Sequence, residues 1–186
     1  MNPIFIVLLV ILGIAIIVIS WFISTLNSFR TMLIKIDESE SSIDVALTQR
    51  FDMLNKLFQA AKGYMKHEAE TLQKVVAMRQ PGRGAPMSEK QAFSDEIARG
   101  LESINIVVEQ YPDLKASENV KTLQEATIAV EENLQASRRV YNSNVSIYNQ
   151  KVVVFPTNIV ANMKKFEKRA FFEAEAAKRE DVVFDF

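Results

Sequence analysis

The residues that could do chemistry in this sequence are few, and their spacing does not bring them together. His67 is the only histidine, and its neighbour Glu68 would point about 100° away from it on a helix. A zinc site needs three or four convergent ligands, and neither H-E-x-x-H nor E-x-x-H occurs. Gly82 and Gly84 lack the Gly-Lys-Ser/Thr of a phosphate loop. With no cysteine and no Ser/His/Asp set, the sequence predicts no catalytic residue, metal site or cofactor.

Two rows of polar residues do share a helical face. The stretch YNSNVSIYN (141–149) separates one Tyr pair and one Asn pair by seven residues each, which is two helical turns. We expect these rows, together with polar residues of the first long helix, to form an interhelical network that fixes the register of the helices. A ligand groove is the alternative. The expected network comprises Asp52, Lys62, Tyr64, Tyr141, Asn142, Tyr148 and Asn149.

A basic stretch near the C-terminal end is interleaved with Phe166, Phe171 and Phe172. Cations and aromatic residues in such a pattern are typical of contact with an anionic membrane surface, and a solvated helix end is the alternative. The cations that we expect at the membrane surface are Lys164, Lys165, Lys168 and Arg169.

The chain begins with an apolar stretch, residues 4–22, which contains no charged residue and to which the rest of the chain is attached. About 20 apolar residues in a helix rise about 30 Å, the thickness of a bilayer core. A cleaved signal peptide would need a basic start and a small-residue cleavage site, and neither is present. The predicted membrane-spanning side chains include Ile4, Phe5, Leu8, Leu12, Ile16, Ile19, Trp21 and Phe22.

Positive charges near a span favour the cytoplasmic side, and only the C-terminal side of this span carries any, at Arg30 and Lys35. We therefore expect a single-pass protein with its larger part in the cytoplasm. The formal net charge of −1 gives no electrostatic reason to expect nucleic acid as a partner.

The rest of the chain predicts long helices, because it holds few Gly and Pro residues and its apolar residues recur at spacings of three, four and seven. We expect a helix to about residue 80, bent or continuous at residues 37–42, a second over 89–110 capped by Ser88, and a third over 117–155. The predicted fold is all-α: an N-terminal transmembrane helix continues into an up-and-down bundle of three long helices plus a short fourth. The expected domains are a tail (1–3), the span (4–23), the bundle (24–180) and an extended tail (181–186).

Several stretches of this chain, in this order, resemble the LemA family of bacterial membrane proteins. The resemblance implies a single span in the bacterial inner membrane, a short extracytoplasmic N-terminus, a cytoplasmic helical bundle and no established reaction. The chain departs from the family pattern at Asn55-Lys56, where a Pro-Asn is usual, and at Glu131-Glu132-Asn133, where Glu-Asn-Arg is common. The matching stretches are RFDMLNKLFQAAKGYMKHE (50–68), YPDLKASENVKTLQ (111–124), RRVYNSNVSIYN (138–149), FPTNIVA (155–161) and FFEAEAAKRE (171–180).

Three functions follow as hypotheses. The first is a non-enzymatic, membrane-anchored scaffold that associates with copies of itself and organises or remodels the membrane, as relatives in the machinery that shapes magnetosome membranes suggest by analogy. The second is a monomeric adaptor that presents its bundle to a soluble partner or a membrane protease. The third is a ligand-binding or enzymatic domain that uses the Tyr and Asn rows.

Overall fold

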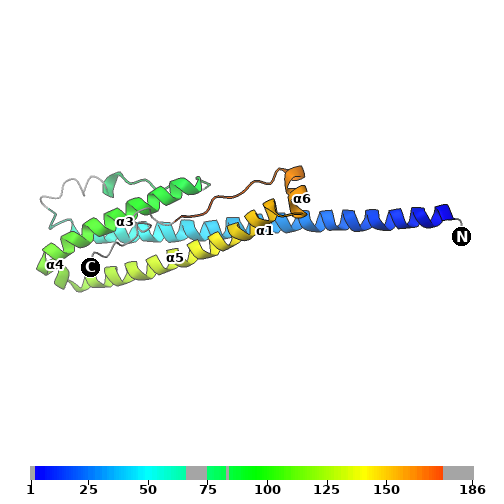
Figure 1. Ribbon diagram of the computed structural model, residues 1–186. Coiled ribbons are helices and arrows are strands. Elements are labelled where there is room, and N and C mark those ends of the chain that lie inside the picture. The colour runs from blue at the N-terminus through cyan, green and yellow to red at the C-terminus, as the bar shows by residue number, and fades with distance from the viewer. Residues whose placement is uncertain (1–2, 66–74, 83, 174–186) are drawn as a thin grey trace, which may run out of the picture. The chain divides into compact units, whose positions relative to one another are not determined.

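The computed structural model describes residues 3–65, 75–82 and 84–173, and no strand occurs in these ranges. The helices in chain order are α1 (Pro3–Ala61), α3 (Met87–Gln110), α4 (Pro112–Ala116), α5 (Glu118–Val153) and α6 (Thr157–Lys164) (Figure 1). The predicted all-α class is therefore confirmed. The chain forms two compact units: unit 1 contains residues 3–38 and 143–170, and unit 2 contains residues 39–142 together with 171–173.

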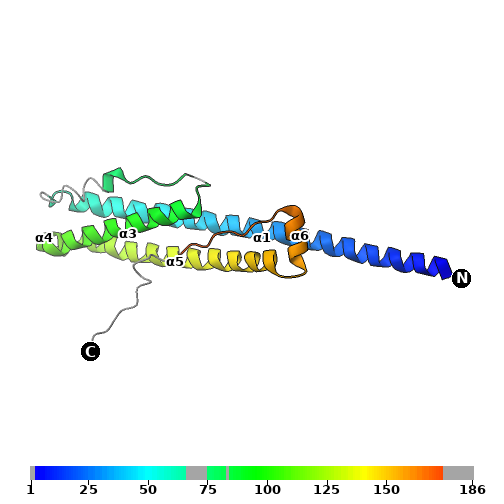
Figure 2. The same cartoon turned by 45° about the horizontal axis from the view of Figure 1, so that its top comes forward.

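Unit 2 is a bundle in which α1, α3 and α5 pack together (Figure 2). Each helix contributes an apolar stripe at helical spacing, and these stripes form the core because removing them from water stabilises the packed state. On α3, Gly100 allows close approach, since a Cβ at this position would lie 3.0 Å from the Leu54 Cδ2 atom of α1. The buried apolar residues include Ile43, Leu47, Leu54, Leu57, Phe58, Phe93, Ile97, Ile104, Val108, Val120, Leu134 and Tyr141.

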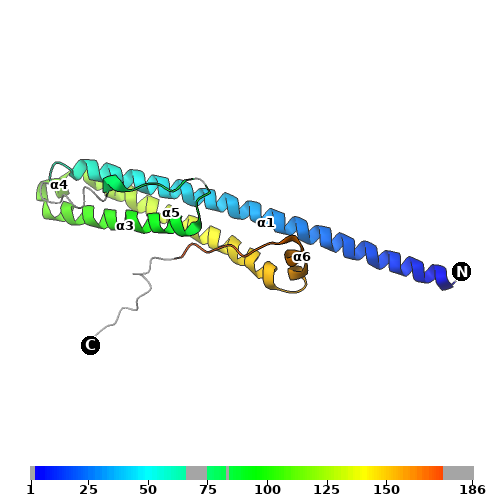
Figure 3. The ribbon, with the colours of Figure 1, turned by 90° about the horizontal axis from the view of Figure 1, so that it is seen from above.

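Unit 1 contains the N-terminal part of α1, the C-terminal end of α5, and α6. In Figure 3, α6 lies beside α1. Phe29 of α1 is fully buried; its ring stacks on Phe166 at 4.8 Å and meets Tyr148 of α5 edge-on at 6.0 Å. Such aromatic contacts add to the burial of apolar area and hold the three segments together.

α1 is continuous through residues 37–42, where the sequence predicted either a bend or a continuous helix. Its predicted extent to residue 80 is wrong, because α1 ends at Ala61. Residues 62–64 form a turn in which the Tyr64 amide donates to the Ala61 carbonyl, and the buried Met65 follows. Gly63 lies in this turn, and glycine lowers the stability of a helix by about 1 kcal/mol.

The predicted N-cap at Ser88 is also wrong. The cap position of α3 is Pro86, no side chain caps the helix, and the amides of Glu89 and Lys90 donate to the Pro86 carbonyl instead. The sequence prediction also missed α4, which starts with Pro112 in its first turn and buries Leu114.

The short fourth helix is confirmed as α6. It ends at Lys164, and Phe166 lies just beyond it. The chain then continues without helix to Glu173. The predicted C-terminal tail at residues 181–186 lies outside the described residues, and so does His67.

Candidate functional site

A buried arginine is the polar centre of unit 2. Arg50 of α1 is 4% exposed, and its Nη1 donates to the carbonyl and hydroxyl oxygens of Ser94 on α3, at 2.9 and 3.1 Å. Its Nε lies 2.7 Å from a carboxylate oxygen of Glu131 on α5. This contact is an ion pair, short but poorly aligned for a hydrogen bond. One guanidinium thus joins the three helices, as a buried charge must be paired to be tolerated.

A second ion pair network joins α1 and α3. The Nζ atom of Lys90 is buried and lies 2.6 Å from Asp44 and 2.9 Å from Glu40. Burial alone would lower the pKa of Lys90, but the hydrogen bonds and charges of Asp44 and Glu40 outweigh it, and the pKa lies above its ordinary value of 10.5. Lys90 is therefore charged in the folded protein at neutral pH.

Sequence reasoning missed both networks, although the spacing held a signal. Arg50 lies on the apolar stripe of α1, three residues after Leu47 and four before Leu54, and Lys90 precedes the buried Phe93 by three residues. A charged residue in such a stripe predicts a buried, paired charge. Glu131, the partner of Arg50, is half-buried against it.

The expected network residues of α1 lie elsewhere. Asp52 is exposed, since it lies about 200° around the helix from both Arg50 and Leu54. Lys62 and Tyr64 follow the end of α1 and are exposed, and the Tyr64 ring lies 5.7 Å from that of Tyr111. The structure thus does not bring these three residues into the core of unit 2.

The expected residues of α5 are buried or hydrogen-bonded, but the two asparagines bond to the backbone after α6 and not to another helix. Tyr141 is buried in unit 2, and Tyr148 is buried against Phe29 in unit 1. In unit 2 the Asn142 carboxamide donates to the Phe172 carbonyl and accepts from the Phe172 amide, both at 2.8 Å. In unit 1, Asn149 makes the same two bonds to Arg169, again at 2.8 Å.

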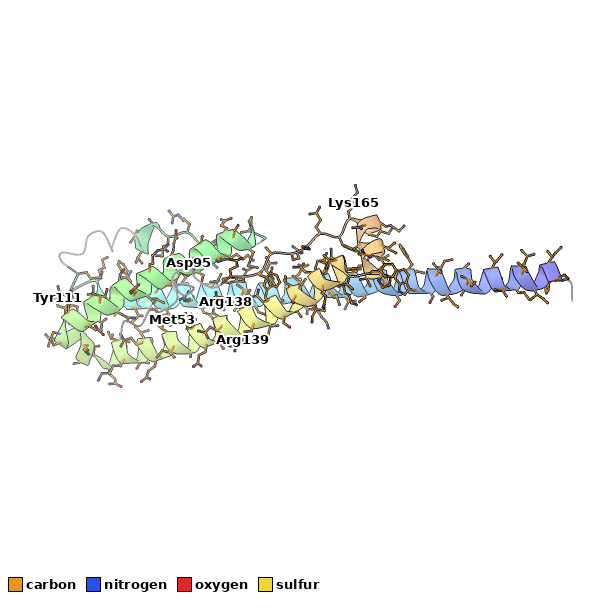
Figure 4. All side chains as sticks on the ribbon, viewed as in Figure 1. Met53, Asp95, Tyr111, Arg138, Arg139 and Lys165 are labelled. Atoms are coloured by element: carbon orange, nitrogen blue, oxygen red, sulfur yellow. The ribbon has the colours of Figure 1, made fainter. Side chains whose placement is uncertain are left out.

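Each of these carboxamides therefore bonds to both the amide and the carbonyl of one residue, as a neighbouring β-strand does. This chemistry holds an extended segment on α5 and does not join two helices. In unit 2, Arg138 adds to it with a hydrogen bond of 2.6 Å to the Glu173 carbonyl and a guanidinium 4.5 Å above the Phe172 ring. The neighbouring Arg139 is exposed (Figure 4).

The four expected cations all lie in unit 1 and differ in their surroundings. Lys164 ends α6, with its Nζ 6.0 Å from the centre of the Phe22 ring. Lys165 and Lys168 are exposed, and Figure 4 shows Lys165 projecting from the turn after α6. Arg169 is instead paired with Asp37 at 3.1 Å.

Burial raises the pKa of the Tyr148 hydroxyl, opposed by the positive charge of Arg169 and supported by the negative charge of Glu167. The hydroxyl is therefore neutral at physiological pH. Across residues 3–65, 75–82 and 84–173 there is no group of three or more His, Asp or Glu side chains that could hold a metal ion.

The N-terminal part of α1 is uncovered. Its large apolar side chains from Ile4 to Ile19 are each 45–69% exposed, and α1 is long and apolar enough to cross a membrane. An uncovered apolar segment that continues into an all-α bundle defines a membrane-associated helical-bundle protein.

A sequence model of the LemA family matches residues 39–186, and the chain belongs to this family. It is 30% identical over 152 residues to Protein LemA of Metamycoplasma hominis, a match that covers 80% of this chain and 68% of that protein. It is also 28% identical over 71 residues to two magnetosome proteins of Paramagnetospirillum magneticum, MamQ 1 and MamQ 2. These matches cover 38% of this chain and 26% of each magnetosome protein.

Proposed function

We propose that this protein is a non-enzymatic, single-pass protein of the bacterial cytoplasmic membrane whose helical bundle associates with other copies as a membrane-organising scaffold. One observation carries the proposal: a bare apolar segment and the first bundle helix form one helix, α1, with no loop between them. An apolar segment that the described residues leave exposed is stable in lipid, where a helix satisfies its own backbone groups. Arg30 and Lys35 favour a cytoplasmic bundle.

Aliphatic side chains on the outer faces of unit 2 support self-association. Val45, Ile106, Ile128 and Val140 are more than half exposed and come from three different helices. They are scattered and could make only weak contacts in solution. Anchoring confines copies to one membrane and raises their effective concentration, so that weak contacts suffice.

The magnetosome relatives supply an analogy for the membrane-organising part of the proposal. Their names assign them to the magnetosome, and the similarity covers 71 residues of this chain. We extend only the general idea of a protein that works at a membrane, since the matched part is 26% of each relative.

A monomeric adaptor is the second candidate, and a specific observation favours it. The apolar stripes of unit 2 are buried within its own bundle, so unit 2 needs no neighbouring copy to cover its core. Such a bundle could present its surface to a soluble partner or to a membrane protease.

Cross-linking in vesicles separates the two candidates. The chain has no native cysteine, so Ile128→Cys and Val140→Cys each provide one reactive site on the outer face of α5. A scaffold predicts covalent dimers for at least one of these variants, at protein-to-lipid ratios where Ile11→Cys, in the apolar segment, gives none. Monomers at both positions, in protein that stays with the vesicles, would favour the adaptor.

A further inference from the structure

The corner between α5 and α6, in unit 1, exposes an apolar surface. Phe155 is 75% exposed and Met163 is 65% exposed, and Ile159 lies one helical turn from Met163 on the same face of α6. The opposite side of α6 is buried through Val160 and Ala161. α6 is therefore a short helix with one face packed in unit 1 and an apolar face left bare.

This corner lies where the apolar segment of α1 ends. Side chains up to Ile19 are exposed, whereas Trp21 and Phe22 are half-buried and Thr25 is buried. Lys164, at the end of α6, lies over the Phe22 ring. Figures 1 and 2 show α6 running across the direction of α1. If α1 stands across a bilayer, α6 lies along the surface of that bilayer, the orientation that interfacial helices adopt.

The charge of this region complements an anionic surface. The whole chain has a net charge of −1, but unit 1 holds seven Lys and Arg residues against three Asp and Glu residues. No acidic residue occurs between positions 133 and 166. Glu167 is the first acidic residue after this stretch.

Lys165 supports a role for this charge. It has a φ of 54°, in the left-handed region, at the C-cap of α6, where glycine is preferred. Strained conformations of this kind are often retained at functional positions. Here an exposed cation occupies a position where glycine would be less strained.

From this geometry we infer that the α5–α6 corner docks onto the bilayer that α1 enters. Phe155, Ile159 and Met163 insert at the level of the headgroups, and the lysine ammonium groups contact anionic lipid phosphates. The contacting cations are Lys164, Lys165 and Lys168. Arg169 takes no part, because its guanidinium is paired with Asp37 and its backbone is held by Asn149. The inference rests on the proposed membrane anchor.

The test uses full-length protein in vesicles that contain phosphatidylglycerol and a nitroxide-labelled lipid. Met163→Cys carries an environment-sensitive fluorophore. Ile11→Cys, in the apolar segment, reports the anchor, and Ile128→Cys is the matched control, since Ile128 is 62% exposed in unit 2. We expect quenching by the lipid label at positions 11 and 163 and none at 128. Ile159→Cys replaces Met163→Cys if circular dichroism shows that the latter loses helicity.

The charge contribution is tested on the same probe. Each of Lys164→Gln, Lys165→Gln and Lys168→Gln should shift the docked-to-undocked ratio by about five-fold toward the undocked state, since one lysine near an anionic surface contributes about 1 kcal/mol. Vesicles of pure phosphatidylcholine should reduce quenching at position 163 as much as the variant that combines all three Lys→Gln substitutions does. Equal quenching with and without the lysines, or with and without anionic lipid, would overturn the role of the headgroup charge.

Quenching at position 11 without quenching at position 163 would overturn the docking and leave the anchor intact. Quenching at 128 as strong as at 163 would also overturn it, because the contact would then not be specific to the corner. Loss of quenching at position 11 would instead mean that the anchor itself fails, and with it the proposed function.

Discussion

Two stretches of α1 have similar apolar side chains and opposite surroundings. Residues 4–19 expose every large apolar side chain, whereas residues 43–61 bury a single stripe that includes Ile43, Leu54 and Phe58. The second stretch also has exposed charged residues such as Asp52 and Lys56 between its apolar ones, and the first has none. The difference shows that the residues between the apolar ones decide the surroundings of a helix. A stretch with charged residues between them buries one face in a bundle, and a stretch without them is suited to lipid on all sides.

The two stretches also differ in how they treat charge. The second buries Arg50, because Ser94 and Glu131 surround its guanidinium with partners. The first offers no polar partner to any charge, since it contains only apolar residues and Gly13. The same substitution should therefore have very different consequences in the two stretches.

The largest effect is expected from charges in the first stretch. Leu8→Arg combined with Leu12→Arg should prevent membrane insertion, because each arginine near the centre of a span costs about 3 kcal/mol. The measurement is the fraction of protein that remains with membranes after alkaline washing. Ile128→Arg, at a similarly exposed apolar residue of α5, should leave this fraction unchanged.

The next effect concerns the buried arginine of the second stretch. Glu131→Ala should lower the free energy of unfolding by about 3 kcal/mol, because it leaves the buried Arg50 charge without its carboxylate. Denaturant unfolding of full-length protein in detergent, followed by circular dichroism, measures this. Glu132→Ala removes an exposed carboxylate next in the chain and is the control. An equal, small loss in both variants would show that the ion pair contributes little.

Lys90 should make unit 2 sensitive to alkaline pH. Its folded pKa is raised, so its stabilising contribution is complete below 10.5 and is lost as the pH rises through the folded value. Tyr148 also lowers the unfolding free energy as the pH rises above its ordinary pKa of 10.0, because burial keeps its hydroxyl neutral in the folded protein. In Lys90→Met, the fall in unfolding free energy between about pH 9 and pH 12 should be shallower by up to about 1.4 kcal/mol per pH unit. Lys56→Met is the matched control on α1. An unchanged slope in Lys90→Met would contradict the raised pKa.

A smaller and local effect is expected from Asn149→Ala, which removes both hydrogen bonds to Arg169. Each bond contributes about 1 kcal/mol, so the Arg169 amide should exchange its hydrogen roughly ten-fold or more faster while the core amides keep their protection. Asn133→Ala, at an exposed asparagine of the same helix, should leave exchange at Arg169 unchanged. Global unfolding in Asn149→Ala would contradict a local role.

The smallest expected change is a gain. Lys165→Gly removes the strain of the left-handed conformation and should stabilise the turn after α6 by about 1 kcal/mol. The midpoint of thermal unfolding measures the gain, and Lys168→Gly, at an exposed neighbouring residue, is the comparison. Equal effects in both variants would show that the conformation of Lys165 stores no strain.

The sequence predicts the long elements well, because periodicity is strong over many turns. It predicts the bare segment of α1, the extents of α3 and α5, and α6 from the breaks at Pro112 and Pro156. The early end of α1 has one local signal in the sequence, Gly63, which is weak within a long helical pattern. α4 had a signal that was missed, since Pro112 with Asp113 is typical of a first helical turn.

The candidate site was predictable only in part. Spacing placed Asn142 and Asn149 on one face of α5, but their partner is an extended segment whose sequence has no periodicity to reveal it. Arg50 and Lys90 lie at apolar-stripe positions, so a search for charges in those stripes would have found them. Which carboxylate pairs with each depends on helix packing, and one sequence does not determine that packing.

Self-association of the membrane-anchored bundle is tested most directly by the mass of the particles that the protein forms. Full-length protein, with a chain mass of 21.1 kDa, would be reconstituted into vesicles over a range of dilutions in lipid, where the anchor still confines the copies, and the mass of its chemically cross-linked particles would be measured by gel electrophoresis. The scaffold predicts a uniform particle of many chains, which the paired substitutions at Leu8 and Leu12 prevent from forming. A particle that contains one chain at every dilution would contradict the claim and favour an adaptor that works as a monomer.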